Sequence, residues 1–279
     1  MTQQTQTRRL FLEKTFKGLA LLAMGYPFAI ERSALRTNHY RLPVPNLPPA
    51  AQGLTIVHLT DLHCGGPFMP AAYAGSLVRK ANAIGGDLIV CTGDFVNIDT
   101  ADEDIVRVWK ALGGLRARLG SYFVLGNHDH WANHQMSLDL LAASGGNLRH
   151  RALRIDFGGD AIWLGGAGDL YEDAPGVNQA FRNTPQGECR ILLAHNPDIV
   201  DFLGAERVDA VLAGHTHGGQ VALPLIGAPF LPVRNKRFAQ GVAQQGRTTV
   251  YVSRGIGCTT LPARLNCPPE ISVLHLAQA

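Results

Sequence analysis

Charged side chains are scarce in this chain of 279 residues, and long apolar runs are missing. Asp, Glu, Lys and Arg make up 17% of the sequence, where about 25% is usual for soluble domains. Hydrophobic residues reach 46%, which excludes an intrinsically disordered chain. No apolar run attains the ~18 residues of a membrane span, so a multi-span membrane protein is excluded too. The length predicts one or two domains with a large core.

Paired cysteines and an excess of basic charge in the body of the chain are also missing. The five cysteines include no C-x-x-C pair, so we expect buried thiols and neither a disulfide framework nor a thiolate nucleophile. The net charge of +3 comes from residues 1–30, and the remainder is neutral. Nothing in the composition therefore attracts nucleic acid, and we expect no nucleic-acid partner.

The amino-terminal residues 1–30 have the form of an export signal or anchor. Arg8 and Arg9 precede Phe11 and Leu12, and an apolar stretch of about 13 residues follows at 18–30. This pattern resembles a twin-arginine signal, which implies a partner in the twin-arginine export machinery. No clear A-x-A cleavage site follows, so we expect an anchor on the outer face of the cytoplasmic membrane. The alternative is an amphipathic helix on the cytoplasmic face.

Residues 31–52 are rich in proline, with Pro43, Pro45, Pro48 and Pro49 in a short span. This composition is typical of an extended linker. We therefore expect the folded domain to occupy residues 53–279.

Short apolar runs alternate with helical patterns through that domain, which predicts an α/β fold. Helices are expected near 70–84, 105–115 and 134–143. The predicted strands are 54–59, 87–91, 122–125, 161–164, 191–193, 210–212, 248–252 and 271–276.

Polar residues follow many of these strands directly. The motifs are D-L-H at 61–63, G-D at 93–94, G-N-H-D at 126–129, A-H-N-P at 194–197 and G-H-T-H at 214–217. The carboxyl ends of strands are where α/β sheets bind ligands. Each motif alone is weak and fits a turn or a cap, but together they predict a metal-binding edge of the sheet.

The order of these motifs resembles the calcineurin-like metallophosphoesterase family, over roughly residues 54–276. The resemblance implies a four-layer α/β/β/α sandwich that holds two divalent metal ions. The tail at 254–271 is similar to a bacterial subgroup of membrane-associated phosphodiesterases, whose relatives include UDP-2,3-diacylglucosamine pyrophosphatases of lipid A biosynthesis. It implies a phosphorylated small-molecule or lipid substrate, and hydrolysis of a phosphodiester or pyrophosphate bond.

The resemblance also assigns roles to residues. Asp94 is the carboxylate that bridges the two ions. Asp61, His63 and His217 complete one metal site, and Asn127, His195 and His215 complete the other. Mixed nitrogen and oxygen ligands suit Mn, Fe, Zn or Co, and leave the choice among them open.

Four further side chains have expected roles near the metals. His128 is the candidate general acid, and Asp129 is expected to orient its imidazole or to cap a local turn. Arg264 and Asn127 are candidate substrate contacts, and the alternative for Arg264 is an ion pair with a carboxylate such as Glu270. The alternatives to a phosphodiesterase are a phosphomonoesterase on the same site or a non-catalytic scaffold on the same fold.

Overall fold

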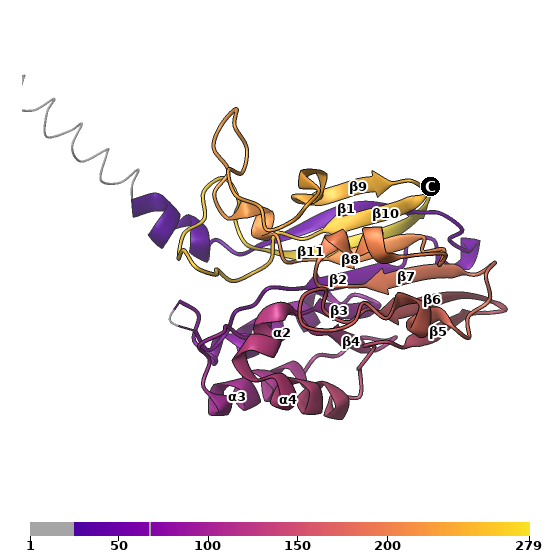
Figure 1. The fold of residues 1–279 in the computed structure, drawn as a ribbon, viewed down its shortest axis with the longest axis horizontal. Helices are drawn as coiled ribbons and strands as arrows, with labels where there is room; N and C mark the ends of the chain where they lie inside the picture. Colours follow the sequence, from indigo (N-terminus) through magenta and orange to yellow (C-terminus); the bar gives the residue numbers. More distant parts are fainter. Residues whose placement is uncertain (1–24, 67) are drawn as a thin grey trace, which may run out of the picture.

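Two β-sheets form the centre of the protein (Figure 1). The computed structural model describes residues 25–66 and 68–279. The first sheet contains, in spatial order, β1 (Arg36–Val44), β11 (Glu270–Gln278), β2 (Thr55–Leu59), β3 (Leu88–Thr92) and β4 (Ser121–Val124). The second contains, also in spatial order, β5 (Ala152–Phe157), β6 (Asp160–Gly166), β7 (Cys189–Leu193), β8 (Ala210–Ala213), β10 (Thr248–Val252) and β9 (Gly241–Gln245).

Three apolar clusters define four layers. Side chains such as Ile56 and Val90 of the first sheet meet Ile191 and Leu212 of the second in an apolar central layer. The outer face of the first sheet is covered by α2 (Tyr73–Ile84), α3 (Asp102–Leu112) and α4 (Asn127–Ala143). The outer face of the second is covered by α5 (Val177–Phe181) and the 3₁₀ turns η3 (Pro197–Phe202) and η5 (Lys236–Phe238). The predicted four-layer α/β/β/α sandwich is therefore confirmed, with short helices in its last layer.

All eight predicted strands and all three predicted helices are present among the described residues. Three strands that the pattern did not indicate are β1, β5 and β9. Helix α4 begins at Asn127, well before the predicted 134, and is interrupted at Asn133, whose φ/ψ of −162°/98° is not helical. Its first turn carries the motif N-H-D-H, which lacks the apolar periodicity that would predict a helix.

The expected proline-rich linker is wrong for this chain. Strand β1 occupies the middle of residues 31–52 and pairs in parallel with β11 over all nine of its residues. Leu42 and Val44 are fully buried in the central layer. Pro43 is tolerated because β1 is the edge strand of its sheet. The folded part therefore includes the segment that we expected to be extended.

A buried carboxylate fastens β1 to the rest of the sheet. Glu270, at the start of β11, accepts hydrogen bonds from Asn38 Nδ2 (2.6 Å) and Tyr40 Oη (2.8 Å) of β1. It also pairs with Arg254 at 2.6 Å. Burial alone would raise the pKa of Glu270, but the hydrogen bond and charge of Arg254 lower it to about 2.

We expect Glu270→Gln to destabilise the fold by about 3 kcal/mol at pH 7, because it leaves the partly buried Arg254 beside an uncharged partner. A carboxyl whose folded pKa is lowered stabilises the protein above its ordinary pKa near 4.5 and loses that contribution as pH falls towards 2. Urea unfolding at pH 7 and pH 3.5 tests this. The difference in free energy of unfolding between wild type and variant should be smaller at pH 3.5 than at pH 7. An equal difference at both pH values would contradict the assignment.

The cysteines and the amino-terminal segment complete the fold. All five cysteines are free and buried, as expected, and burial raises the pKa of the Cys64 thiol to about 12. In the described part of the chain, no helix combines the length and apolar character that crossing a bilayer needs. Most of the predicted signal, including Arg8 and Arg9, lies outside the described residues. Its last residues contact the domain, where the carbonyl of Pro27 accepts a hydrogen bond from the Arg264 amide at 3.0 Å.

Candidate metal centre

The ends of five elements bring the predicted ligands together. Asp61 and His63 follow β2, Asp94 follows β3, Asn127 opens α4 just after β4, His195 follows β7, and His215 and His217 follow β8. Backbone hydrogen bonds hold neighbouring ends in register, such as Asp61 N to Gly93 O and Gly214 N to His195 O. Because β2, β3 and β4 are parallel, as are β7 and β8, these ends share one edge of the sandwich.

Several of these residues have an unusual backbone conformation. Positive φ angles of 47–69° occur at five of the predicted ligands. Side chains other than glycine rarely adopt this left-handed region, and such strain concentrates at functional sites. The five are Asp61, His63, Asp94, His215 and His217.

The first group of ligands contains Asp61, His63 and His217, whose donor atoms all lie within 4.8 Å of one another. His63 Nε2 lies 3.0 Å from His217 Nε2, which in turn lies 3.3 Å from Asp61 Oδ1. Burial lowers the pKa of His63 to about 3, so its ring is neutral at pH 7. Two neutral imidazoles and a carboxylate that converge in this way fit a divalent cation.

The second group contains Asp94, His195 and His215. His195 Nε2 lies 3.2 Å from Asp94 Oδ2 and 3.1 Å from His215 Nδ1. Backbone carbonyls face the opposite ring nitrogens, Thr92 O at 2.8 Å from His195 Nδ1 and Pro232 O at 3.0 Å from His215 Nε2. Such outer partners fix ring orientation and leave the inner nitrogen free to ligate.

Asp94 and Asn127 complete the arrangement. Asp94 Oδ2 lies 3.5 Å from His63 Nε2 as well as near His195, so this carboxylate belongs to both groups. Burial alone would raise the pKa of Asp94, but the nearby His195, His128 and His63 hold it well below its usual range. The buried Asn127 Oδ1 has no hydrogen-bond partner within the described residues. An unpaired amide oxygen and a shared carboxylate are what a pair of cations would use.

Glycine at the start of the G-N-H-D motif is required by this packing. A Cβ on Gly126 would lie 2.3 Å from Asp94 Oδ1 and 2.7 Å from His195 Nδ1. Any side chain there would push the second ligand group apart.

His128 lies at the edge of the ligands. Its amide donates to Asp94 Oδ1 at 2.9 Å, and its ring meets that of His63 edge-on at a centroid distance of 4.6 Å. A third possible ligand group contains His63, Asp94 and His128. Distance alone therefore allows His128 to be a ligand, and its role as an acid stays a prediction.

The expectation that Asp129 orients the imidazole of His128 is wrong. Its carboxylate is fully buried and accepts hydrogen bonds from the amides of Gly126, Asp94, Phe95 and Val96, at 2.8–3.3 Å. The His128 Nδ1 has no partner among the described residues. Asp129 caps the first turn of α4, the alternative that the sequence left open, and thereby holds the loop that carries Asp94.

The expectation that Arg264 contacts substrate is wrong as well. Its side chain is fully buried, and its guanidinium donates to the carbonyls of Arg254, Gly257 and Cys267. Glu270 pairs with Arg254 instead. Arg264 Nη2 lies 3.3 Å from His217 Nδ1, so Arg264 contacts the ring nitrogen of His217 that faces away from the other ligands.

A cavity of about 630 Å³ opens in front of the ligands. Asp94, Asn127, His128, His215 and His217 line it. Its apolar wall includes Trp131, Val221, Pro229, Phe230 and Leu261. Among the residues that follow the G-N-H-D motif, Trp131 therefore faces the cavity, while His130 and His134 face each other at 2.9 Å.

Sequence reasoning missed one buried carboxylate near the site. Asp169 follows β6, and its Oδ1 accepts the amides of Tyr171 and Glu172. Its Oδ2 is buried without a partner in the described part of the chain. Burial lowers the pKa of His128 and the charge of Asp169 opposes that shift, while for His195 it adds to the larger effect of Asp94, which raises the pKa. The same strand-end rule that found the ligands indicates Asp169, which lies three residues beyond the end of β6, a spacing within the range of the ligands.

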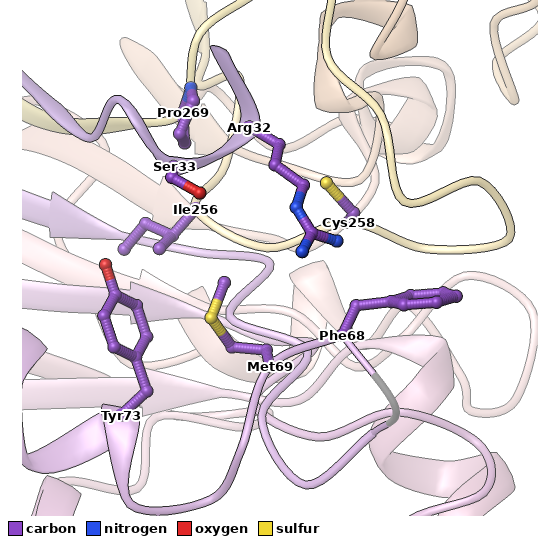
Figure 2. A pocket seen from close by; sticks show the side chains of 8 residues that line it. All are labelled: Arg32, Ser33, Phe68, Met69, Tyr73, Ile256, Cys258 and Pro269. Atoms are coloured by element: carbon purple, nitrogen blue, oxygen red, sulfur yellow. The ribbon is translucent and has the colours of Figure 1, made fainter. Parts of the chain in front are cut away.

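A second, smaller cavity of about 170 Å³ lies behind the segment 256–261 (Figure 2). Ile256 and Cys258 face this cavity, whereas Thr259, Thr260 and Leu261 line the larger one. Arg32 extends over it toward Cys258, opposite Met69 and Phe68 (Figure 2). No carboxylate or imidazole lines it, so the larger cavity is the one that belongs to the metal centre.

Comparisons with known proteins agree with this geometry. The family model described as calcineurin-like phosphoesterase matches residues 54–219. Phosphodiesterase YaeI of Escherichia coli is 33% identical over 97% of this chain and 99% of its own length. An uncharacterized metallophosphoesterase of Bacillus subtilis, YkuE, is 31% identical over 97% of each chain. A bovine transmembrane protein with a metallophosphoesterase domain is 33% identical over 98% of this chain, which spans 64% of that protein. The chain therefore belongs to the calcineurin-like phosphoesterases, a family of metal-dependent phosphoester hydrolases.

Proposed function

We propose that this protein hydrolyses a phosphodiester or pyrophosphate bond in a lipid-linked or nucleotide-sugar substrate such as UDP-2,3-diacylglucosamine. The observation that carries the proposal is the cavity of about 630 Å³, which is lined both by ligand residues and by an apolar wall. A phosphate alone needs far less space and no apolar wall. The wall suits a substrate that carries an apolar group next to its phosphorus.

Each group of residues in the cavity would have its own role in hydrolysis. The groups around Asp61 and His195, joined by Asp94, would hold two divalent ions of the Mn, Fe, Zn or Co type, with Asn127 as an uncharged ligand. When bound, such ions supply positive charge for phosphoryl oxygens and make water nucleophilic at neutral pH. His128, beside the cavity, would give a proton to the leaving oxygen. Trp131, Phe230 and Leu261 would hold the rest of the substrate and exclude water.

A panel of substrates tests the reaction class. The metal-loaded protein should hydrolyse bis-p-nitrophenyl phosphate at least about tenfold faster than p-nitrophenyl phosphate, because a diester presents a single negative charge to the buried carboxylates. UDP-2,3-diacylglucosamine should outcompete UDP-N-acetylglucosamine, which lacks the acyl chains. Faster turnover of the monoester would assign a phosphomonoesterase, and no turnover of any ester would favour a scaffold.

The location that we propose is the outer face of the cytoplasmic membrane, reached by twin-arginine export. Replacing Arg8 and Arg9 with Lys keeps the charge and the apolar segment, and we expect it to block export because that pathway reads guanidinium groups. Fractionation and protease accessibility of intact spheroplasts measure this. Wild-type protein that stays protected, with no change in the Lys pair, would assign the cytoplasmic face instead.

A further inference from the structure

The segment 221–233 consists of 13 residues without a single charged or hydrogen-bonding side chain, V-A-L-P-L-I-G-A-P-F-L-P-V. It connects the ligand loop after β8 with η5 and projects as the tall orange loop of Figure 1. Leu225 is fully exposed, and Ile226 and Phe230 are 72% and 73% exposed. Single exposed apolar residues are ordinary, but an entire uncharged loop with none of its side chains buried needs a partner.

The loop tip is held in one shape. Leu223 and Gly227 exchange two backbone hydrogen bonds, at 2.8 and 2.9 Å. Leu225, between them, has a positive φ of 66°. The turn therefore presents Leu225 and Ile226 to solvent as a fixed pair.

The loop stands beside the amino-terminal apolar segment. Leu265 accepts a hydrogen bond from the Ala222 amide at 2.8 Å, and the adjacent Arg264 amide donates to Pro27 O at 3.0 Å. The segment 264–266 thus fastens the loop on one side and residues 26–30 on the other. Phe28 and Ile30 there are also about half exposed. In Figure 1 the loop and the amino-terminal helix leave the same end of the molecule.

Three basic residues stand at the carboxyl end of the loop. Arg234, Lys236 and Arg237 follow the loop directly and are exposed. Apolar side chains next to cations fit the boundary between acyl chains and anionic headgroups, where each basic residue contributes about fivefold in affinity.

We propose that the loop 221–233, together with Phe28, Ile30 and Leu261, is a membrane-docking surface that inserts into the headgroup region of an anionic bilayer. Phe230 and Leu261 belong both to this surface and to the wall of the large cavity. Docking therefore places the cavity mouth at the bilayer, where a lipid headgroup can enter it without leaving the membrane. The surface does not depend on hydrolysis and can be tested without it.

A fluorescent label reports insertion at the loop itself. The five native cysteines are buried, so an environment-sensitive nitrobenzoxadiazole label on Ile226→Cys in the full chain is selective. With vesicles of phosphatidylethanolamine and phosphatidylglycerol at 3:1, its emission should shift to the blue and its quenching by iodide should fall at least about fivefold. The control is Val106→Cys on α3, where the native side chain is 45% exposed and the label should not change.

A matched pair of double variants measures the contribution to affinity. Leu225→Ser/Ile226→Ser should weaken vesicle binding by about 10- to 100-fold, since burial of each side chain is worth roughly a factor of ten. Val106→Ser/Val242→Ser replaces two apolar residues exposed elsewhere and should bind like wild type. Neither pair lines the large cavity, so both should hydrolyse a soluble diester at the wild-type rate.

The outcomes separate the two proposals. A label at 226 that stays in water while the protein binds vesicles overturns the docking surface, whatever the diesterase assay shows. A blue shift that grows with protein concentration in the absence of vesicles would show that the loop contacts a second copy of the chain. That result would also overturn the docking surface. Insertion without any diester hydrolysis would leave the docking surface intact and refute the proposed function.

Discussion

Asp94→Asn is expected to lose phosphodiester hydrolysis by more than about 10²-fold, a loss that even outer partners of metal ligands can produce. Bound metal should fall well below two ions per chain. Asp94 lies between the two ligand groups, 3.5 Å from His63 and 3.2 Å from His195. Two cations held close together repel, and an amide at that place would no longer offset their repulsion. Metal analysis of the purified variant, together with rates on a soluble diester, measures both effects.

Asp99→Asn is the matched control. Asp99 is an exposed carboxylate five residues further along the same loop, and its amide variant should keep both metals and turnover. If Asp94→Asn retained two ions and normal rates, Asp94 would not be the bridge and the assignment of the centre would fail. If both variants lost metal alike, the loss would reflect the charge of the loop and not a ligand.

The core and the positions of the ligands were predictable because they depend on local sequence. Buried strands such as β3 and β8 are continuous apolar runs, and their ends are marked by Gly and by polar residues. Parallel strands bring their carboxyl ends to a common edge whatever the loops do. His195 and His215 are 20 residues apart in sequence, yet the pairing of β7 with β8 places their ring nitrogens 3.1 Å apart.

What the sequence could not predict is the direction of a side chain within its motif. Asp129 adjoins His128, but the first turn of α4 directs its carboxylate back to the amides of the loop after β3. Arg264 was expected to contact substrate, but it is fully buried and its guanidinium donates to the carbonyls of Arg254, Gly257 and Cys267. Strand β1 contains Pro43 and has no clean alternation, and it is a strand only because β11 provides a partner. Each of these depends on contacts with residues far away in the chain.

His128→Ala is expected to keep both metals and to lose turnover by about 10²- to 10⁴-fold, the usual contribution of a positioned general acid. His128 lines the cavity, and its ring packs on Trp131 with centroids 4.9 Å apart. Burial lowers the pKa of His128, so its ring is neutral in the free protein at pH 7. An anionic phosphate in the cavity would favour the protonated ring, which then has a proton to give.

The leaving group and the metal content together decide the role of His128. A p-nitrophenolate departs without much help, so His128→Ala should lose less on bis-p-nitrophenyl phosphate than on a substrate whose leaving group is an alcohol. The comparison variant is His215→Ala, which removes a ligand in our assignment and should lose metal with both substrates. His63, Asp94 and His128 also lie close enough to hold an ion. If His128→Ala lost as much metal as His215→Ala and the same fraction of activity on both substrates, His128 would be a ligand, and the proton for the leaving oxygen would have to come from another side chain in the cavity.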